Sequence, residues 1–444
     1  MENYKIKATK SGLKTLVIKR PKNPTRLNIN LVIGLGSDLE YGKYLELGHF
    51  LEHLFVSLTS NKYPDSKATR ELFSTNSIGY SASVGTKNTI YEFSLDRSQI
   101  DMFLDILVHG IFDFKVDKEI FENEKNSILE ELNELIDDIS YPLETHTDTM
   151  IYKHNYREIP QKMRLANTRK MKPNDVQNYW NRFYRLPYMV LAVYGSVDIN
   201  TLVDKIDTLS YGIVEKNNVR HLHNHQNLTH LYKAFSLNNE SRILFTKKMD
   251  KISTIKLNWR IDMNTFSEDY YKLYCIDNLL ISDLDSLLLR KLRGEKGLIY
   301  DIESHFSIDE FQNNLSFYFF QTTVASHKVL KVIEAFMEVI DYITKNKIKV
   351  KNYDKYLTNQ KHIMLERNES LDYSYVLTNY AKYILYNKNI VTQQQEDKKF
   401  TDISRDDIHN TAKTLFNTNN LYISYANEKN ISKEIDAILS KQEF

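Results

Sequence analysis

Residues 49–53 read His-Phe-Leu-Glu-His, and this pentad restricts the chain more than any other stretch. On an α-helix, side chains four residues apart lie one above the other, so His49 and His53 can reach one metal ion from the same face. Glu52 lies beside them. The flanking sequence is mostly apolar and predicts a helix at about residues 43–58. The pentad is therefore a zinc-site hypothesis, and its alternative is an amphipathic helix that carries two surface histidines.

A catalytic zinc ion usually takes three protein ligands and leaves a fourth position for water, so a further group must come from elsewhere. Residues 124–132 contain no glycine or proline and are predicted to be helical. Glu124 and Glu131 are seven residues apart there, which places both carboxylates on one helix face. By distance along the chain alone, Glu130 is an equal alternative. Without the histidine pair, this segment would be interpreted as a solvated acidic helix face.

His-x-x-Glu-His, followed further along by Glu-x-x-x-x-x-x-Glu, resembles the pitrilysin and insulysin family of zinc peptidases, which includes the two-domain mitochondrial processing peptidases. The resemblance implies Zn²⁺ as the cofactor, with His49, His53 and Glu131 as its ligands. It implies Glu52 as the general base and Glu124 as a carboxylate that supports the ligands. The ligand on the second helix is Glu131 because the family carries its outer glutamate seven positions before the ligand.

Composition limits the class of protein. A chain of 444 residues suggests two or more domains, and 59 Lys and Arg against 58 Asp and Glu favour neither nucleic acid nor a membrane as partner. The only cysteine, Cys275, excludes an intrachain disulfide framework, fits a reducing compartment and is predicted to be a buried structural thiol. The first residues lack the basic start of a secretory signal, and no apolar stretch reaches about 18 residues. We therefore expect a soluble, cytoplasmic protein.

Periodicity predicts two successive α+β units with a similar order of elements, which is compatible with an internal duplication. The resemblance covers both units and implies an α+β fold of two like-folded domains, each a mostly antiparallel sheet packed with helices. In the first half, strands are predicted at residues 4–9, 13–19, 27–33, 80–84, 89–95 and 189–194, and further helices at about 66–76 (with Gly79 as its stop), 98–113, 117–139 and 173–180. In the second half, strands are predicted at about 253–263, 298–306, 314–322 and 421–425, and helices at about 268–293, 327–345 and 352–367.

A polar run that begins at Lys216 separates the two halves. We predict a zinc-bearing catalytic domain at 1–215, a linker at 216–230 and a second like-folded domain at 231–444. The resemblance implies that only the first holds metal, and residues 276–282, at the place equivalent to the pentad, contain no histidine pair.

Arg293 and Tyr300 resemble an Arg and a Tyr that lie seven positions apart in the family's second type of domain. A guanidinium and a phenol donate hydrogen bonds that suit a substrate carbonyl, or the oxyanion that forms from it. The resemblance therefore implies a catalytic role for this pair. The alternative is a basic helix end followed by an ordinary tyrosine.

Residues 79–83 resemble the family's edge strand, along which a bound peptide adds itself as another strand. The resemblance implies Gly79, Ser81 and Ala82 as substrate-binding residues. The chain departs from the family at Ser81, where Asn is usual, and at Val84, where Thr is usual. Backbone pairing does not depend on these side chains, so the departures affect only the side-chain contact near the scissile bond.

Four histidines in the linker form a second metal-site hypothesis, but no Cys or carboxylate at ligand spacing accompanies them, and a solvated linker explains them. They are His221, His223, His225 and His230.

These observations predict a zinc-dependent endopeptidase that cleaves peptides or unfolded segments in an enclosed chamber, with peptide processing and leader removal among its uses. A structural zinc site would need four closed ligands, which this set does not have. The alternative is a catalytically inactive binding or assembly subunit of the same fold. In single-chain relatives with four such domains, the zinc of the first domain is completed by the Arg and Tyr of the fourth across an enclosed chamber. For a chain with one metal-bearing half and one half with Arg293 and Tyr300, the resemblance therefore implies a homodimer in which each site combines both subunits, with a heterodimer as the alternative.

Overall fold

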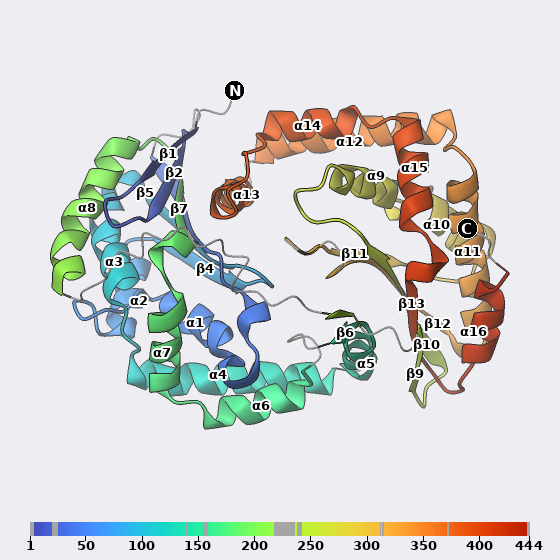
Figure 1. Cartoon of the computed structure of the whole chain (residues 1–444), viewed down its shortest axis with the longest axis horizontal. Helices are drawn as coiled ribbons and strands as arrows, with labels where there is room; N and C mark the ends of the chain where they lie inside the picture. The colour runs from blue at the N-terminus through green and yellow to red at the C-terminus, as the bar shows by residue number, and fades with distance from the viewer. Residues whose placement is uncertain are drawn as a thin grey trace. The chain divides into compact units, whose positions relative to one another are not determined.

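The strands of the first half pair into one six-stranded sheet in the computed structural model, which describes residues 4–19, 25–138, 141–153, 159–216, 236–237, 242–310, 312, 315–370 and 373–441. Their order across the sheet is β1-β2-β7-β3-β5-β4 (Figure 1). β2 and β7 are parallel, and the other neighbours are antiparallel. The strands are β1 Tyr4–Ala8, β2 Lys14–Ile18, β3 Arg26–Ile33, β4 Gly79–Val84, β5 Thr89–Asp96 and β7 Met189–Tyr194.

Each face of this sheet has its own helical cover, because successive side chains of a strand point to opposite faces. Tyr91 and Phe93 of β5 point to one face, where their rings contact Phe55 of α1 and Phe103 of α3 at centroid distances of 4.8 and 4.9 Å. Glu92 points to the other face, which α13 covers (Figure 1). The helices of this unit are α1 Leu47–Phe55, α2 Ser66–Thr75, α3 Ile100–Asp113, α4 Lys118–Asp137, α6 Gln161–Lys170, α7 Pro173–Phe183, α8 Ile199–Lys216 and α13 Tyr373–Leu385.

The second half forms a five-stranded sheet in the order β11-β12-β10-β13-β9. Its one parallel pair is β13 with β9. Trp259 of β10 is fully buried against Phe320 and Phe336, at centroid distances of 6.1 and 5.9 Å, and marks the core. The strands are β9 Ile243–Lys247, β10 Ile252–Ile261, β11 Glu303–Ser307, β12 Ser316–Ala325 and β13 Leu421–Asn427, and a separate two-stranded sheet pairs β6 Tyr152–Lys153 with β8 Ser236–Leu237.

Regular α-helix is interrupted after α9, in the helical segment that accompanies the second sheet. α9 is followed by a one-turn helix and then by a π-helical turn at Arg290–Glu295. The helices are α5 Tyr141–Ile151, α9 Asp269–Ile281, α10 Leu287–Leu289, α11 Val329–Lys345, α12 Val350–Ser370, α14 Gln393–Thr401, α15 Arg405–Leu415 and α16 Ser432–Leu439.

The two sheets share one topology. Reading β2-β7-β3-β5-β4 against β9-β13-β10-β12-β11 gives the same chain order, with the single parallel pair at the same place. The predicted α+β class and the two like-folded domains are therefore confirmed. The agreement arises because each half repeats one sequence of strands and helices, as an internal duplication requires.

The compact units differ from the contiguous halves of the sequence. Unit 1 comprises Met1–Asp137, Ile159–Lys233 and Leu371–Gln393, and unit 2 comprises Asp138–Glu158, Ala234–Ser370 and Gln394–Phe444. Within unit 2, α5 packs on β13 and β9, and within unit 1, α13 packs on β7 and β3. The halves thus exchange one helix each, which periodicity along the chain does not reveal. Most of the predicted linker lies outside the described residues.

The pentad helix is shorter than the predicted range 43–58. α1 begins at Leu47 and ends at Phe55. A 3₁₀ turn at Gly42–Tyr44 comes first, and Glu46 then has a φ of 70°, which no right-handed helix accommodates. The sequence is apolar on both sides of Glu46, so it did not reveal that the helix begins only at Leu47.

Two other helix ends also differ from the prediction. α2 stops at Thr75 because Ser77 has a φ of 51°, while Gly79 begins β4 and does not end the helix. The predicted helix at 268–293 is interrupted after Ile281, where the Asp283 side chain accepts the backbone N–H of Asp285 at 2.8 Å. Such a turn competes with helical hydrogen bonding.

The predicted strand at 298–306 begins later than expected. The N–H of Leu298 donates to the carbonyl of Leu292 at 2.8 Å and closes the preceding helical turn, so β11 begins at Glu303. α5, α6, α8 and α13 to α16 are further helices that the coarse periodicity did not predict. Among the described residues, we find no helix long and apolar enough to cross a membrane.

Candidate metal centre

The pentad lies on α1, whose apolar face is buried. Phe50 on that face stacks on Phe121 of α4, with ring centroids 5.1 Å apart. This contact holds α1 against α4. As a result, the half-buried imidazoles of His49 and His53 face the carboxylates that α4 carries.

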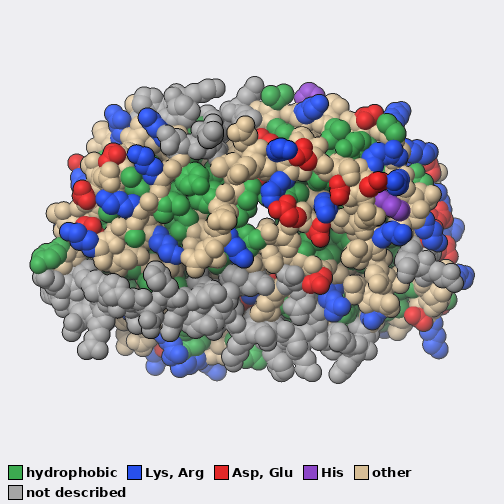
Figure 2. Space-filling view, turned by 45° about the horizontal axis from the view of Figure 1, so that its top comes forward, with side chains coloured by type: hydrophobic (Ala, Val, Ile, Leu, Met, Phe, Trp, Pro, Cys, Tyr) green, Lys and Arg blue, Asp and Glu red, His purple; other side chains and the backbone are tan. Residues whose placement is uncertain are grey.

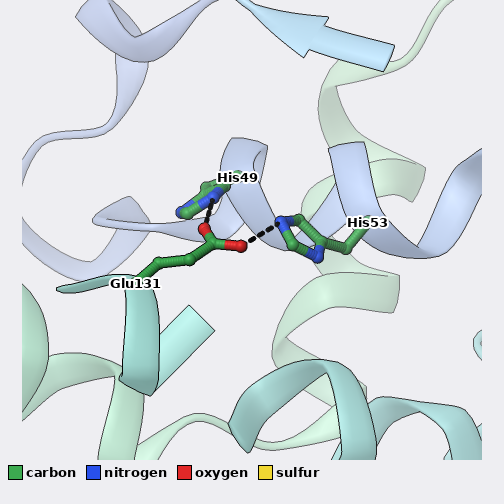
Figure 3. Close-up of side chains that lie close together, drawn as sticks. All are labelled: His49, His53 and Glu131. Carbon is green, nitrogen blue, oxygen red and sulfur yellow. Dashed lines mark ion pairs between the residues drawn. The ribbon is translucent and has the colours of Figure 1, made fainter. Parts of the chain in front are cut away.

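Both imidazoles and one carboxylate converge in this region (Figure 3). Nε2 of His49 lies 3.2 Å from Oε2 of Glu131, and Nε2 of His53 lies 3.7 Å from Oε1 of the same carboxylate. One ligand atom from each of the three residues lies within 4.8 Å of the others. Over the part of the chain that the structure describes, this is the one group of three His, Cys, Asp or Glu side chains that could hold a metal ion.

The donor set fits zinc. Zinc bonds nitrogen and oxygen at about 2.1 Å, which places tetrahedral ligands about 3.4 Å apart, close to the separations seen here. Nδ1 of His49 lies 3.0 Å from Oε2 of Glu46, and Nδ1 of His53 lies 3.0 Å from Oε2 of Glu124. Each carboxylate accepts the Nδ1 proton, so the Nε2 lone pair is free to bind a metal ion.

A guanidinium holds each of these carboxylates. Arg70 of α2 donates to Oε1 of Glu124 at 2.8 Å, and Arg164 of α6 pairs with Glu46. Burial alone would raise the pKa of Glu124, but the hydrogen bonds from His53 and Arg70 outweigh it and lower that pKa. Burial likewise opposes ionisation of Glu46, and its bonds to His49 and Arg164 lower its pKa instead. Both carboxylates therefore accept hydrogen bonds in their ionised form.

The carboxylates around the site also shift the pKa of the second histidine, His53. Burial alone would lower the pKa of His53, but its hydrogen bond to Glu124 and the charges of Glu131 and Glu124 raise it. Without metal, the site thus attracts a cation. A bound metal ion would take the place of that proton on the imidazole.

A third carboxyl group lies behind the first turn of α1. Oε2 of Glu40 accepts the backbone N–H of Glu46 at 2.8 Å, and the side chain packs against Gly48 so closely that a Cβ there would lie 2.3 Å from Oε1. Burial, and after it the charge of Glu46, raises the pKa of Glu40 to about 8. This acid is therefore mostly protonated at neutral pH.

Sequence analysis missed four of these residues: Glu40, Glu46, Arg70 and Arg164. Only Glu46 had a local signal, because it precedes His49 by three residues. The other three reach the site from segments that are distant in sequence.

The adjacent glutamates of α4 have different surroundings. Glu131 is near both histidines, whereas Glu130 is not part of the cluster. Glu52 is half-buried next to His53. It lies close to Tyr91, whose pKa is raised mainly by burial and also by Tyr184 and Glu52. The geometry agrees with the expected ligand set, while the catalytic role of Glu52 stays a prediction.

Arg293 and Tyr300 lie in unit 2. Arg293 belongs to the π-helical turn, and its guanidinium carbon is 4.7 Å from the centroid of the Tyr300 ring. The tyrosine is 79% exposed. The two predicted residues therefore form one cation–π pair in which the tyrosine is exposed and the arginine is half-buried.

The predicted substrate strand, with Gly79, Ser81 and Ala82, forms β4. Among the described strands, β4 is at the edge of its sheet and pairs with β5 alone. Ser81 points to the face that α13 covers, where its hydroxyl donates to Oε2 of Glu92 at 2.9 Å. Ala82 points to the opposite face, with α1. The free edge is available for backbone pairing, whereas the Ser81 side chain is engaged within its own sheet.

Two further predictions concern residues away from the cluster. Cys275 is fully buried, and burial raises the pKa of its thiol to about 12, as expected for a structural cysteine. The histidines of the linker hypothesis, His221, His223, His225 and His230, lie outside the described residues. On the face shown in Figure 2, acidic and basic side chains are interspersed, which agrees with the balanced composition.

Comparisons with known proteins agree with the fold and the motif. Residues 15–169 match the family model for insulinase (peptidase family M16), and residues 170–360 match that for the peptidase M16 inactive domain. An uncharacterized zinc protease of Rickettsia felis is 23% identical, over 94% of this chain and 96% of that protein. The uncharacterized zinc protease YmxG of Bacillus subtilis is also 23% identical, over 67% of this chain and 69% of that protein.

A solved structure has the same fold over the whole chain. The protease from Helicobacter pylori superposes with a TM-score of 0.79 at 15% identity, over 96% of this chain and 100% of that one. At this identity, the likeness concerns the fold alone. The two family models together match residues 15–360, and the first of them covers the pentad and the α4 glutamates. The chain belongs to the insulinase family of peptidases, family M16.

Proposed function

We propose that this protein is a zinc-dependent endopeptidase that cleaves peptides or unfolded segments. One observation carries the proposal: two imidazole Nε2 atoms and the Glu131 carboxylate converge within 4.8 Å, while both Nδ1 atoms are held by carboxylates. Three protein ligands leave a coordination position open, which is typical of a catalytic zinc site. Two relatives named as zinc proteases support the same function.

In this mechanism, His49, His53 and Glu131 hold the ion, and zinc, when bound, supplies a Lewis acid that activates water and polarises a carbonyl. Glu52 takes the proton of the attacking water and passes it to the leaving amine. Its position next to His53, without membership in the ligand cluster, supports a role as base and not as ligand.

We propose that the substrate binds as an added strand along β4, at Gly79, Ser81 and Ala82. Two observations support this: β4 is the edge of its sheet, and its neighbour α1 carries the pentad. Backbone pairing accepts many sequences. Because the Ser81 hydroxyl already donates to Glu92, we infer that Ser81 contributes to substrate binding through its backbone.

We also propose that Arg293 and Tyr300 donate hydrogen bonds to the oxyanion, within a homodimer in which each subunit supplies this pair to the zinc of its partner and encloses the substrate in a chamber. The exposure of Tyr300 and its contact with Arg293 support a pair available for such a role. A heterodimer with a related chain is the alternative.

The rival function is a catalytically inactive binding or assembly subunit of the same fold. The family model for the second half is named an inactive domain, but the pentad lies in the half that matches the other model. The complete set of His49, Glu52, His53 and Glu131 favours the enzyme. For the cellular role, we propose peptide processing or leader removal in the cytoplasm, in keeping with a single buried cysteine.

The test is digestion of a random peptide library by the zinc-loaded protein, with products identified by mass spectrometry. We expect internal cleavage that is lost on treatment with a chelator and restored by zinc. Glu52→Gln is the control for contaminating proteases, and Glu130→Gln is the control for a neutral change of a nearby carboxylate. Products that are the same with wild type and Glu52→Gln would support the inactive subunit.

A further inference from the structure

Glu46, the residue before α1, has a φ of 70° and a ψ of 2°. This is the left-handed region, which glycine adopts freely and residues with a Cβ rarely adopt. The Glu46 side chain is also fully buried, with an exposure of 0%. A glutamate at such a position is unfavourable for both its backbone and its charge, so its contacts must compensate for both.

The left-handed backbone directs the Glu46 side chain toward the first turn of α1. Its Oε2 lies 3.0 Å from Nδ1 of His49. The carboxylate makes no capping hydrogen bond to the helix backbone among the described residues. Helix capping, the usual reason for an acidic residue at this position, therefore does not explain Glu46.

Three contacts hold Glu46 in this conformation. Arg164 of α6 pairs with its Oε1, and Asn167, one turn further along α6, donates to the carbonyl of Leu45 at 2.7 Å. The backbone N–H of Glu46 donates to Glu40 at 2.8 Å. Two side chains of α6 therefore hold this segment: Arg164 binds the Glu46 side chain, and Asn167 binds the backbone carbonyl of Leu45.

The arrangement repeats one found at the other imidazole. Nδ1 of His53 lies 3.0 Å from Glu124, and Arg70 donates to the second oxygen of Glu124 at 2.8 Å. The family resemblance already assigns Glu124 a supporting role. The equivalent series of contacts at His49, from its Nδ1 to Glu46 and on to Arg164, is known from the geometry of the structure alone.

We infer that Glu46 is a positioning residue for the metal centre: it holds the Nδ1 proton of His49 so that Nε2 faces the ion, and Arg164 orients the Glu46 carboxylate. This inference rests on the proposed zinc site. Partners of this kind commonly set metal affinity by a factor of about 10 to 100. The left-handed backbone at Glu46 then serves the site, because it turns the carboxylate toward His49.

The test compares zinc affinity with the stability of the metal-free protein. Glu46→Gly suits the left-handed backbone but removes the carboxylate. The double variant Glu46→Gly/Arg164→Met also removes the guanidinium of Arg164, which would otherwise lose its Glu46 partner. Glu46→Gln keeps an oxygen that accepts the Nδ1 proton. Ser77→Gly is the matched control, because Ser77 also has a positive φ, 51°, and lies outside the cluster. Zinc dissociation constants come from chelator competition, and the visible spectrum of the cobalt-substituted protein reports ligand geometry.

We expect Glu46→Gly and the double variant to weaken zinc binding about 10- to 100-fold and to alter the cobalt spectrum. The melting temperature of the metal-free double variant should not fall. Glu46→Gln should lose less than about 10-fold, and Ser77→Gly should lose nothing. Unchanged zinc affinity in Glu46→Gly and the double variant would overturn the inference and leave the zinc site intact. A wild-type protein that binds no zinc would instead refute the proposed function, and this inference with it.

Discussion

Replacing Glu131 by Gln should weaken zinc binding far more than replacing its neighbour Glu130 by Gln. The two residues are adjacent on α4, but successive side chains on a helix point about 100° apart, so only one can face the histidines. The oxygens of Glu131 lie 3.2 and 3.7 Å from the two Nε2 atoms, whereas Glu130 is outside the cluster. The pair therefore compares a ligand with a matched non-ligand of the same chemistry.

The expected magnitude follows from the number of ligands. Loss of a supporting partner of a metal ligand costs about 10- to 100-fold in affinity, and loss of one of three protein ligands should cost more. We therefore expect the zinc dissociation constant of Glu131→Gln to rise by at least about 100-fold, or about 2.8 kcal/mol. The Glu131 side chain is 47% exposed, so the metal-free variant should differ from wild type by no more than about 0.5 kcal/mol in its free energy of unfolding.

Competition with a chelator of known affinity measures the dissociation constant, and thermal melts of the metal-free proteins measure stability. Glu130→Gln should match wild type in both. Equal loss of zinc from the two variants, or greater loss from Glu130→Gln, would refute the assignment of Glu131 as the ligand. A large loss of stability in metal-free Glu131→Gln would mean that the fall in affinity reflects damage to the fold.

Three further predictions concern Glu52, Arg293 and Asp105. Glu52→Gln should abolish peptide cleavage but retain zinc, since Glu52 lies outside the ligand cluster, and metal analysis showing zinc lost along with activity would make Glu52 structural. Mixing inactive Glu52→Gln with inactive Arg293→Ala should restore part of the activity through mixed dimers with one intact site, and no recovery despite demonstrated subunit exchange would mean that Arg293 does not complete a partner's site. Asp105 accepts a hydrogen bond from Lys62 at 2.5 Å and another from Tyr63. Burial alone would raise the pKa of Asp105, but these hydrogen bonds outweigh burial and lower that pKa below its ordinary 3.8. A lowered folded-state pKa gives stability that is present above the unfolded pKa and lost as pH falls through the folded one, so Asp105→Asn should cost about 1 kcal/mol at pH 7. Urea denaturation at several pH values should show that difference shrinking below about pH 4, and a difference that is constant down to pH 2 would contradict the ion-pair explanation.

Local periodicity predicted which side chains of the metal centre share a helix face, and the family resemblance then selected Glu131 over Glu130 as the ligand. His49 and His53 share a face because they are four residues apart on one helix, and Glu124 and Glu131 share a face because they are seven apart on another. Each relation depends only on the geometry of a single helix. The strand at 80–84 was predictable for the same reason, since alternation within a few residues indicates a strand.

The structure alone decided how these elements support one another. Arg70 and Arg164 reach the two carboxylates from helices that are distant in sequence, and no spacing along the chain encodes such contacts. Glu46 was locally misread as part of a helix because its left-handed backbone depends on contacts with Glu40 and α6. The exchange of α5 and α13 was equally hidden: both are ordinary helices in sequence, and only the sheet that each one packs on distinguishes them. Periodicity records which face of an element is buried, but the partner that buries it is decided only when distant segments pack together.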